Sequence, residues 1–473
     1  MSTLDTDVLI VGAGPTGLAL GIDLARRGVD ALVVERADGL FPGSRGKGLQ
    51  PRTMEVFDDL GVVDAFLAAG GPYPVGMVWK DGERVGEHRM FDEPDGSEDS
   101  PYLGPWMVPQ WRTQEILLAR LEELGGKVAF GREVTGLAQD ADGVTARLAD
   151  GAALRARYLV AADGGRSAVR RALGIAMAGE SVDPAPMLVA DVRISGLDRD
   201  HLHVFPPSPA GSDYLVIWPL AGTEDFQLTA QFPPDTAPDL SLAGIRRVAA
   251  ARTHLAAEDV TEVRWASDFR PRAALADRFR AGRVFLAGDA AHVHSPAGGQ
   301  GLNTSVQDAY NLGWKLGAVL RDGAPEALLD SYEAERRPNA RRMLELSTAV
   351  HRGKARRGKA TRQLGLGYRE SPLTAETRTA PDGTLRAGDR APDATVAGVR
   401  LFDAFRGPHW TLLALGTEAP GDADALPGVR VVRGPAQEPY GTGLFLVRPD
   451  GYVGWAGDTA EGLAGRLTRF GIG

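Results

Sequence analysis

The 473-residue sequence contains no cysteine. This absence excludes disulfides, thiolate metal sites and cysteine nucleophiles, so any redox chemistry has to come from a bound cofactor. The sequence also lacks an apolar run of the roughly 18 residues that a membrane-spanning helix needs, and its first residues enter a strand without a signal-peptide pattern. We therefore expect a soluble, cytoplasmic protein without a membrane partner.

An excess of basic residues is also missing. Lys and Arg together number 53, against 62 Asp and Glu, which gives a formal net charge of -9 and a pI near 5.5. This balance argues against a nucleic-acid partner. The composition is otherwise that of a globular protein, with 43% hydrophobic and 24% charged residues, and the length predicts roughly two or three domains.

The first motif is a glycine-rich turn inside a predicted βαβ unit. A strand, the turn GAGPTG, a helix and a second strand follow one another at residues 7–11, 12–17, 18–28 and 31–34. In this G-x-G-x-x-G pattern Gly12 permits the tight turn, Gly14 lets a pyrophosphate approach the backbone, and Gly17 lets helix and strand pack closely. Glu35 ends the second strand and can accept hydrogen bonds from the adenosine ribose. A carboxylate there favours FAD or NAD over NADP.

Two more predicted strands end in an acid beside glycines. Residues 154–162 lead into Asp163-Gly164, and residues 284–286 lead into Gly288-Asp289. After the latter, a loop with three glycines enters a helix predicted from Leu302 to Lys315. Backbone N–H groups at such a helix start, together with the helix dipole, favour an anion. The alternative interpretation is a tight structural turn followed by a capped helix.

Two intervening stretches, 72–110 and 185–232, are rich in short strands. Lys80-Asp-Gly82 is a hairpin signal, and the later strands alternate apolar and polar residues, so that one face packs and the other is wet or covers a ligand. Residues 366–385 are predicted to be a linker, and a separate small α/β pattern runs from 385 to 473. Three aromatic residues stand near the predicted pocket wall, but core packing is the favoured explanation for each: Tyr102, Trp106 and Trp111.

The strand-end motifs, in this order, resemble the FAD-dependent aromatic hydroxylases with the p-hydroxybenzoate hydroxylase fold. The chain looks most similar to the polyketide, phenol and rifampicin-type branch, and the tail resembles a thioredoxin-like domain through 388–392 and 446–451. The implied fold is α/β: a discontinuous Rossmann-like FAD-binding domain (1–71, 111–180 and 270–365), a β-sheet-rich substrate domain (72–110 and 181–269) and a small thioredoxin-like C-terminal domain (385–473). Without cysteine, the tail would be structural or serve oligomer contacts.

The resemblance also implies where FAD is held. Its pyrophosphate would contact Gly12, Gly14, Thr16 and Gly17. Its adenosine end would contact Glu35, Arg36 and Val134. Its ribityl and ring end would contact Arg45, Gln110, Asp289, Pro296, Gly299, Leu302 and Asn303. Asp163 supports a glycine motif that the family links to both FAD and NAD(P)H. Gln114 lies one helical turn after Gln110 and leaves open which of the two serves the flavin.

The implied activity is monooxygenation. NADH or NADPH reduces the flavin, reduced flavin and O₂ form a C4a-hydroperoxide, and one oxygen atom is transferred to an electron-rich carbon of a phenolic or polycyclic aromatic substrate. The amides of residues 301–303 would stabilise the negative charge of the reduced flavin, and Pro296 would line the oxygen side. No metal site and no catalytic triad are expected, and we assign neither His292 nor His294 as a base.

Only one framed G-x-G-x-x-G is present in the sequence, so a second Rossmann domain for the nicotinamide is not expected. We hypothesise that NAD(P)H binds transiently and that the flavin swings out to meet it, with Arg45 taking part from its glycine-flanked loop. The protein would act as a monomer or homodimer. The substrate pocket should lie between the two strand-rich stretches and the flavin loop.

Three alternatives remain open at the level of sequence. A Baeyer–Villiger oxygenase or a flavin dehydrogenase could share this fold, and nothing in the residues excludes either. A non-catalytic binding protein that kept the dinucleotide fold, as the Rab escort and GDP-dissociation inhibitor proteins did, is a remote third. The intact Gly288-Asp289 and Gly298-Gly299 argue against it.

Overall fold

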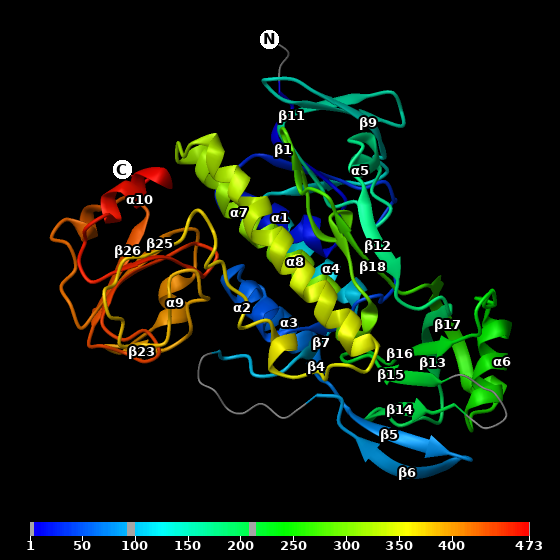
Figure 1. Ribbon diagram of the computed structural model, residues 1–473. Helices are drawn as coiled ribbons and strands as arrows, with labels where there is room; N and C mark the ends of the chain where they lie inside the picture. Colours follow the sequence, from blue (N-terminus) through cyan, green and yellow to red (C-terminus); the bar gives the residue numbers. More distant parts are fainter. Residues whose placement is uncertain (1–3, 92–99, 208–213, 473) are drawn as a thin grey trace.

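The computed structural model describes residues 4–91, 100–207 and 214–472. The remaining residues, 1–3, 92–99, 208–213 and 473, belong to the predicted domain ranges and lie outside the described residues. Figure 1 shows three regions: a central α/β body, a sheet with a hairpin and helix α6 on one side, and a C-terminal unit on the other.

The central body is built on an eight-stranded sheet with the order β19-β20-β11-β1-β2-β8, which β10 and β9 extend from β11. Its strands are β1 (Thr6–Val11), β2 (Ala31–Val34), β8 (Lys127–Ala129), β9 (Val134–Gln139), β10 (Val144–Leu148), β11 (Ala153–Ala161), β19 (Arg280–Ala281) and β20 (Val284–Leu286). The neighbours β20, β11, β1 and β2 pair in parallel. The carboxyl ends of these strands therefore meet at one edge, where ligands bind in open α/β sheets.

Helices cover this sheet, and the longest two cross the middle of the molecule in Figure 1. They are α1 (Pro15–Ala25), α2 (Pro51–Asp59), α3 (Val63–Ala69), α4 (Gln110–Glu123), α5 (Ala168–Ala172), α7 (Gly301–Arg321) and α8 (Asp330–His351). Helix α1 begins earlier than predicted because Pro15 occupies its first turn after Gly14, where the missing N–H and fixed φ of proline suit a helix start. Nearly all of α7 is buried, so it forms part of the core.

A seven-stranded sheet forms the second region, with the order β17-β13-β16-β15-β14-β5-β6. Its strands are β5 (Val75–Lys80), β6 (Glu83–His88), β13 (Met187–Ile194), β14 (His201–Phe205), β15 (Leu215–Pro219), β16 (Phe226–Gln231) and β17 (Val260–Phe269). Helix α6 (Leu242–Arg252) packs on one face through Ile245 and Ala249. The predicted hairpin turn is confirmed, since β5 pairs antiparallel with β6 and both Asp81 and Gly82 have positive φ.

The C-terminal unit has a five-stranded sheet with the order β22-β28-β27-β25-β26. Its elements are β22 (Ala375–Glu376), α9 (Leu401–Phe405), β25 (Trp410–Leu415), β26 (Val429–Gly434), β27 (Gly443–Val447), β28 (Val453–Gly457) and α10 (Leu463–Arg469). The predicted linker 366–385 is wrong as a linker, because it contributes β22 and the buried Tyr368 and Leu373. Isolated apolar side chains among Thr, Pro and Gly gave no period that could reveal this packing.

Three minor sheets complete the fold. They contain β12 (Met177–Ser181), β18 (Arg272–Ala276) and β21 (His292–Val293); β3 (Gly48–Leu49), β7 (Trp106–Met107) and β4 (Gly71–Pro72); and β23 (Thr395–Val396) with β24 (Val399–Arg400). The strands of each of the three larger sheets come from one predicted domain. The exception is β22, which lies between the predicted domains. The exact domain boundaries stay a prediction. Over the described chain, no helix is both long and apolar enough to cross a membrane.

Candidate functional site

The three strand-end motifs meet at the carboxyl edge of the large sheet. A side chain at Gly12, where φ is +110°, would collide with the carbonyl of Ala162 at the end of β11. A Cβ at Gly288 would lie 2.6 Å from the Thr16 hydroxyl and 3.2 Å from Ser305 in α7. The turns after β1, β11 and β20 and the start of α7 thus form one continuous surface, although almost 300 residues separate the first from the last.

The βαβ turn has the shape that a dinucleotide needs. Gly17 fits only as glycine, because a side chain there would collide with the carbonyl of Gly12, whereas a Cβ at Gly14 would meet nothing within 4 Å. Backbone crowding at one position and open space at the other are what helix–strand packing and pyrophosphate approach require. The Glu35 carboxylate accepts from the N–H groups of Ala13 and Ala37, at 2.9 and 3.0 Å, and retains lone pairs for a ligand.

The predicted adenosine contacts lie beside Glu35. Arg36 is exposed and Val134 is buried at the start of β9. The backbone just before Val134 runs along the end of β2, since the N–H of Arg132 donates to the carbonyl of Glu35 at 2.8 Å. The structure therefore brings Val134 close to the βαβ unit although about 100 residues separate them in sequence.

Asp163 serves as a cap between β11 and α5. Its Oδ2 accepts from the N–H groups of Ala168 and Val169, at 2.8 and 3.2 Å. Its Oδ1 is buried without a hydrogen-bond partner among the described residues. The strand-end acid of this motif thus orders the glycine turn that lies directly against Gly12, and one oxygen is left for a further donor.

The loop after β2 carries Arg45 and Gly46 to the start of α7. The Gly46 N–H donates to Gln110 Oε1 at 2.9 Å, and a Cβ at Gly46 would lie 3.1 Å from Leu302. Gln114 is buried and donates to the carbonyl of Phe41 instead, so the geometry favours Gln110 for the flavin end. Arg45 is exposed, and its guanidinium lies over the rings of Phe41 and Trp265, 5.1 and 5.9 Å from their centroids.

The N-terminus of α7 is held open toward this loop. The Asn303 side chain accepts from the Gln50 N–H at 2.7 Å and donates to the carbonyls of Gly48 and Gly299, both at 2.8 Å. No side chain of the described chain caps the helix, so its first amides keep their donors for a ligand. Gly299 has φ of +63°, and it and Pro296 are exposed on the loop.

Asp289 presents its carboxylate to solvent between these elements. Desolvation by its surroundings raises its pKa, against the opposing influence of His292 and Arg45. An accessible carboxylate in such a confined place suits hydroxyl donors such as those of a ribityl chain, because each would replace a lost hydrogen bond to water.

A buried network behind Asp289 was not predicted. Asp308 accepts from the Gly288 N–H at 3.0 Å, from Arg336 at 2.7 Å and from His292. Burial acts to raise the pKa of Asp308, but His292 and Arg336 hold it below its usual value. The network fixes the Gly288-Asp289 turn against α7 and α8. No local sequence pattern marks Asp308 as the partner of Gly288, because the two residues stand on different elements and 20 positions apart.

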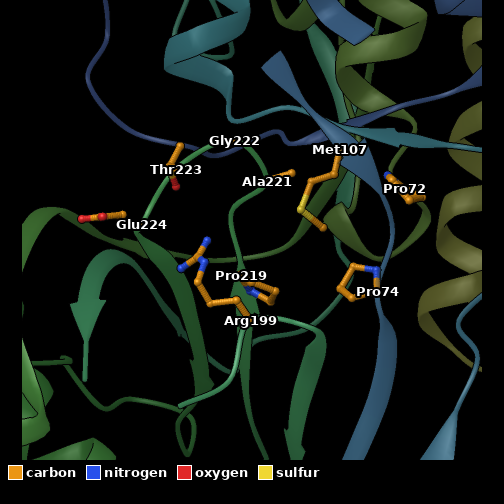
Figure 2. A pocket seen from close by; sticks show the side chains of 9 residues that line it. All are labelled: Pro72, Pro74, Met107, Arg199, Pro219, Ala221, Gly222, Thr223 and Glu224. Atoms are coloured by element: carbon orange, nitrogen blue, oxygen red, sulfur yellow. The ribbon is translucent and has the colours of Figure 1, made fainter. Parts of the chain in front are cut away.

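A cavity of about 490 Å³ lies between the seven-stranded sheet and the short strands β4 and β7 (Figure 2). It is lined by Pro72, Pro74, Met107, Arg199, Pro219, Ala221, Gly222, Thr223 and Glu224. Both strand-rich stretches contribute, as predicted, but no residue of the flavin loop does. Trp106 and Tyr102 do not line it; they donate to the Phe66 carbonyl and to Asp58 and pack against the central core together.

The residues at the sheet edge fit FAD. The sheet edge offers an open backbone turn at Gly14, the Glu35 carboxylate, an exposed carboxylate at Asp289 and the uncapped helix start at Asn303. These groups suit, respectively, a pyrophosphate, a ribose, a hydroxylated chain and a ring that becomes anionic.

Comparison with known families agrees with this geometry. Residues 5–347 match the model described as "FAD binding domain", and residues 384–471 match "Aromatic-ring hydroxylase, C-terminal". The chain belongs to the FAD-dependent aromatic-ring hydroxylases. The predicted α/β fold with a discontinuous FAD-binding domain and a small C-terminal domain is thereby confirmed, and this hydroxylase is a flavin-dependent monooxygenase.

Relatives match over nearly their whole length. The hydroxylase is 47% identical to a flavin-dependent monooxygenase of Mycobacteroides abscessus, covering 98% of this chain and 99% of that protein. It is 34% identical to a rifampicin monooxygenase of Rhodococcus hoagii, covering 98% of each. Among solved structures, aklavinone-11 hydroxylase in a complex with FAD and aklavinone superposes with a TM-score of 0.86 at 32% identity, covering 99% of each chain.

Proposed function

We propose that this hydroxylase uses NADH or NADPH and O₂ to place a hydroxyl group on a phenolic or polycyclic aromatic substrate of the polyketide type. The observation that carries the proposal is the convergence of three strand-end turns and the uncapped start of α7 on one surface. The substrate class is supported by relatives named for rifampicin and anhydrotetracycline and by the neighbour that binds aklavinone.

FAD, when bound and reduced, supplies the chemistry that activates O₂ and delivers one oxygen atom. The chain's part is to bind and orient. The free amides of α7 around Leu302 and Asn303 would stabilise negative charge at the flavin's pyrimidine edge, because the helix dipole and N–H donors point there. Asn303 keeps those amides in place through its bonds to Gln50, Gly48 and Gly299.

The cofactor residues are proposed according to the part of FAD that each would hold. The turn from Gly12 to Gly17 holds the pyrophosphate, with Thr16 at the Gly288 turn. The adenosine end is placed by Glu35, Arg36 and Val134, supported by the Asp163 cap. The ribityl and ring end is placed by Arg45, Gln110, Asp289, Pro296, Gly299, Leu302 and Asn303. No catalytic acid is assigned, because transfer of oxygen to an electron-rich ring requires no strong acid from the protein. No residue is assigned as a base either.

The role proposed for Arg45 is to help the flavin reach a transiently bound nicotinamide. Its exposed guanidinium lies over Phe41 and Trp265. Among the described residues it forms no ion pair, so it can move with its glycine-flanked loop. Arg45→Ala should slow reduction of the flavin by NAD(P)H by about ten-fold or more while FAD stays bound. Stopped-flow reduction and FAD content measure the two effects. The matched control is Arg112→Ala, a change in an exposed arginine; unchanged reduction rates in Arg45→Ala would remove this role.

The proposed function is tested with the purified, FAD-loaded protein. Phenols and polycyclic aromatic compounds are screened for faster oxidation of NADH and NADPH, and the products are analysed by mass spectrometry after reaction under ¹⁸O₂ and by NMR. Gain of one labelled oxygen as a ring hydroxyl supports the proposal. Oxygen inserted into a ring indicates Baeyer–Villiger chemistry, and a product without new oxygen indicates a dehydrogenase. Sedimentation distinguishes monomer from homodimer.

A further inference from the structure

Lys47 connects the flavin loop to the sheet that covers it. Its neighbours on either side are fixed at the start of α7, because the Gly46 N–H bonds to Gln110 beside Leu302 and the carbonyl of Gly48 accepts from Asn303. These bonds hold the Lys47 backbone next to the proposed ring end of the cofactor. The residue itself is only partly buried.

The Lys47 side chain reaches the face of the seven-stranded sheet that α6 does not cover. On β15 and β16, Ile217 and Leu228 pack toward α6, and successive side chains alternate between faces. Trp218 and Gln227 therefore point the other way. Lys47 Nζ lies 4.4 Å from the centroid of a Trp218 ring and donates to Gln227 Oε1.

This face has an aromatic wall. The ring of Tyr73 meets those of Phe91 and Trp218 edge-on, with centroids 4.9 and 6.0 Å apart. Its hydroxyl lies against Gly48, where a side chain would collide with it. A planar ring placed between this wall and the start of α7 would have the Lys47 ammonium at its edge.

The ammonium has donors to spare. Nζ carries three N–H groups, and Gln227 receives the one hydrogen bond that Lys47 makes within the described chain. The charged groups around it are Asp191 on β13 and Arg357 after α8. Burial lowers the pKa of Lys47 to about 8. The charge of Asp191 acts to raise this pKa, and the charge of Arg357 acts to lower it further. A cation that is desolvated in this way, beside an aromatic wall and with unused donors, is typical of a functional group.

We propose that Lys47 binds an ionised oxygen of the aromatic substrate, so that this hydroxylase accepts rings bearing an acidic phenol, enol or carboxyl group. The proposal rests on the proposed function, since it assigns a binding contact to the aromatic substrate of that reaction. An ammonium with unused donors stabilises an anionic oxygen more strongly than a neutral one. The competing interpretation, a purely structural pair of Lys47 with Asp191, predicts no effect on ligand ionisation.

The test uses the FAD-loaded protein and three anthraquinone probes: alizarin, which changes from yellow to red-violet when a phenol ionises, anthraquinone-2-carboxylate, and unsubstituted anthraquinone. Wild-type protein should turn alizarin red-violet at a pH where the free dye is still yellow. Lys47→Met, which keeps length but removes charge, should bind the acidic probes roughly ten- to hundred-fold more weakly and abolish the colour shift. Anthraquinone itself should bind equally well.

Lys80→Met is the matched control, because Lys80 is exposed at the far end of β5. If Lys47→Met folds poorly, Lys47→Arg, which keeps the charge, should retain part of the colour shift. Loss of alizarin binding alone assigns a phenol or enol, and loss of the carboxylate alone assigns a carboxyl group. Equal binding and an equal colour shift in wild type and Lys47→Met would overturn the proposal while leaving the monooxygenase function intact. If wild type binds none of the three probes, the aromatic pocket itself is wrong.

Discussion

At the scale of the residue, Asp191 shows how a buried charge is tolerated beside the proposed pocket. It is 2% exposed on β13. Burial raises its pKa to about 6, although bonds from Ser44 and Gln227 and the charge of Lys47 act to lower it. The carboxylate thus resists ionisation in the folded protein more than in the unfolded chain.

The sign of the resulting pH dependence follows from linkage. Because the folded pKa lies above the unfolded value of 3.8, the folded protein takes up this proton first as the pH falls. Wild type should therefore gain stability relative to Asp191→Asn between pH 7 and pH 4, by on the order of 1–3 kcal/mol. Lys47 stays charged throughout this range. Urea unfolding of both proteins across the range measures the difference, and a pH-independent difference would contradict the assignment.

Residues in short local patterns could be predicted, while those that act across the fold could not. Gly12, Glu35 and Asp289 stand at strand ends with glycine nearby, which identifies them from sequence alone. Asp308 and Arg336 lie inside helices and look like solvated surface charges, yet they form a buried network behind Asp289. Burial depends on which helix faces meet, and a single sequence does not contain that information.

At the scale of the element, local patterns predicted strands better than helix ends. Strands β2 and β20 have the predicted bounds, because a buried strand is a continuous apolar run. Helix α7 extends to Arg321, well beyond the predicted Lys315. Its later turns pack against the C-terminal unit through Trp314 and Ala318, a contact that the helical period could not reveal.

The βαβ turn allows folding and cofactor binding to be separated. A methyl group at Gly17 would overlap the Gly12 carbonyl, while one at Gly14 would meet no protein atom within 4 Å, and the φ of Gly14 is -73°. Gly17→Ala should therefore destabilise the protein itself. Gly14→Ala should leave the stability of the FAD-free protein within about 1 kcal/mol but weaken FAD binding roughly ten-fold or more.

Thermal unfolding of the FAD-free proteins and fluorescence titration with FAD distinguish the two variants. Gly86→Ala is the control, since that position on β6 is exposed and open. If Gly14→Ala bound FAD as tightly as wild type, the pyrophosphate would not lie against this turn.

At the scale of the whole molecule, a buried ionic cluster ties the C-terminal unit to the central body. Glu335 of α8 bonds to Arg448, to Lys315 of α7 at 2.7 Å and to Ser371, and Arg448 also pairs with Asp450. Arg448 and Glu335 are 113 residues apart in the sequence. The sequence suggested a separate tail, whereas the contacts join it to the body that forms the cofactor site (Figure 1).

The cluster makes a last prediction about how the molecule unfolds. Burial opposes ionisation of Glu335, but Arg448 and Lys315 hold its pKa well below the usual range. A carboxyl with a depressed pKa stabilises above its unfolded pKa and loses this effect only as the pH falls through the folded value. Glu335→Gln would leave two buried cations short of a counter-charge, which costs about 3–5 kcal/mol. Burial lowers the pKa of Lys315 to about 8 although Glu335 acts to raise it, so without Glu335 this pKa falls further and the loss of stability should grow as the pH falls from 8 to 6.

Urea unfolding followed by tryptophan fluorescence is a direct readout, because Arg448 lies over the Trp314 ring, 5.1 Å from its centroid. Glu345→Gln, an exposed change on the same helix, should have no effect. Replacing all four charged residues of the cluster, Glu335, Lys315, Arg448 and Asp450, by Leu, Met, Met and Asn should cost less than Glu335→Gln alone, since uncharged side chains of similar size leave no charge unpaired. If Glu335→Gln unfolds like wild type, the cluster does not hold the two parts together, and the C-terminal unit is attached by its other contacts, which include the pairs Arg390–Glu55 and Arg406–Asp58 and the apolar packing on α7.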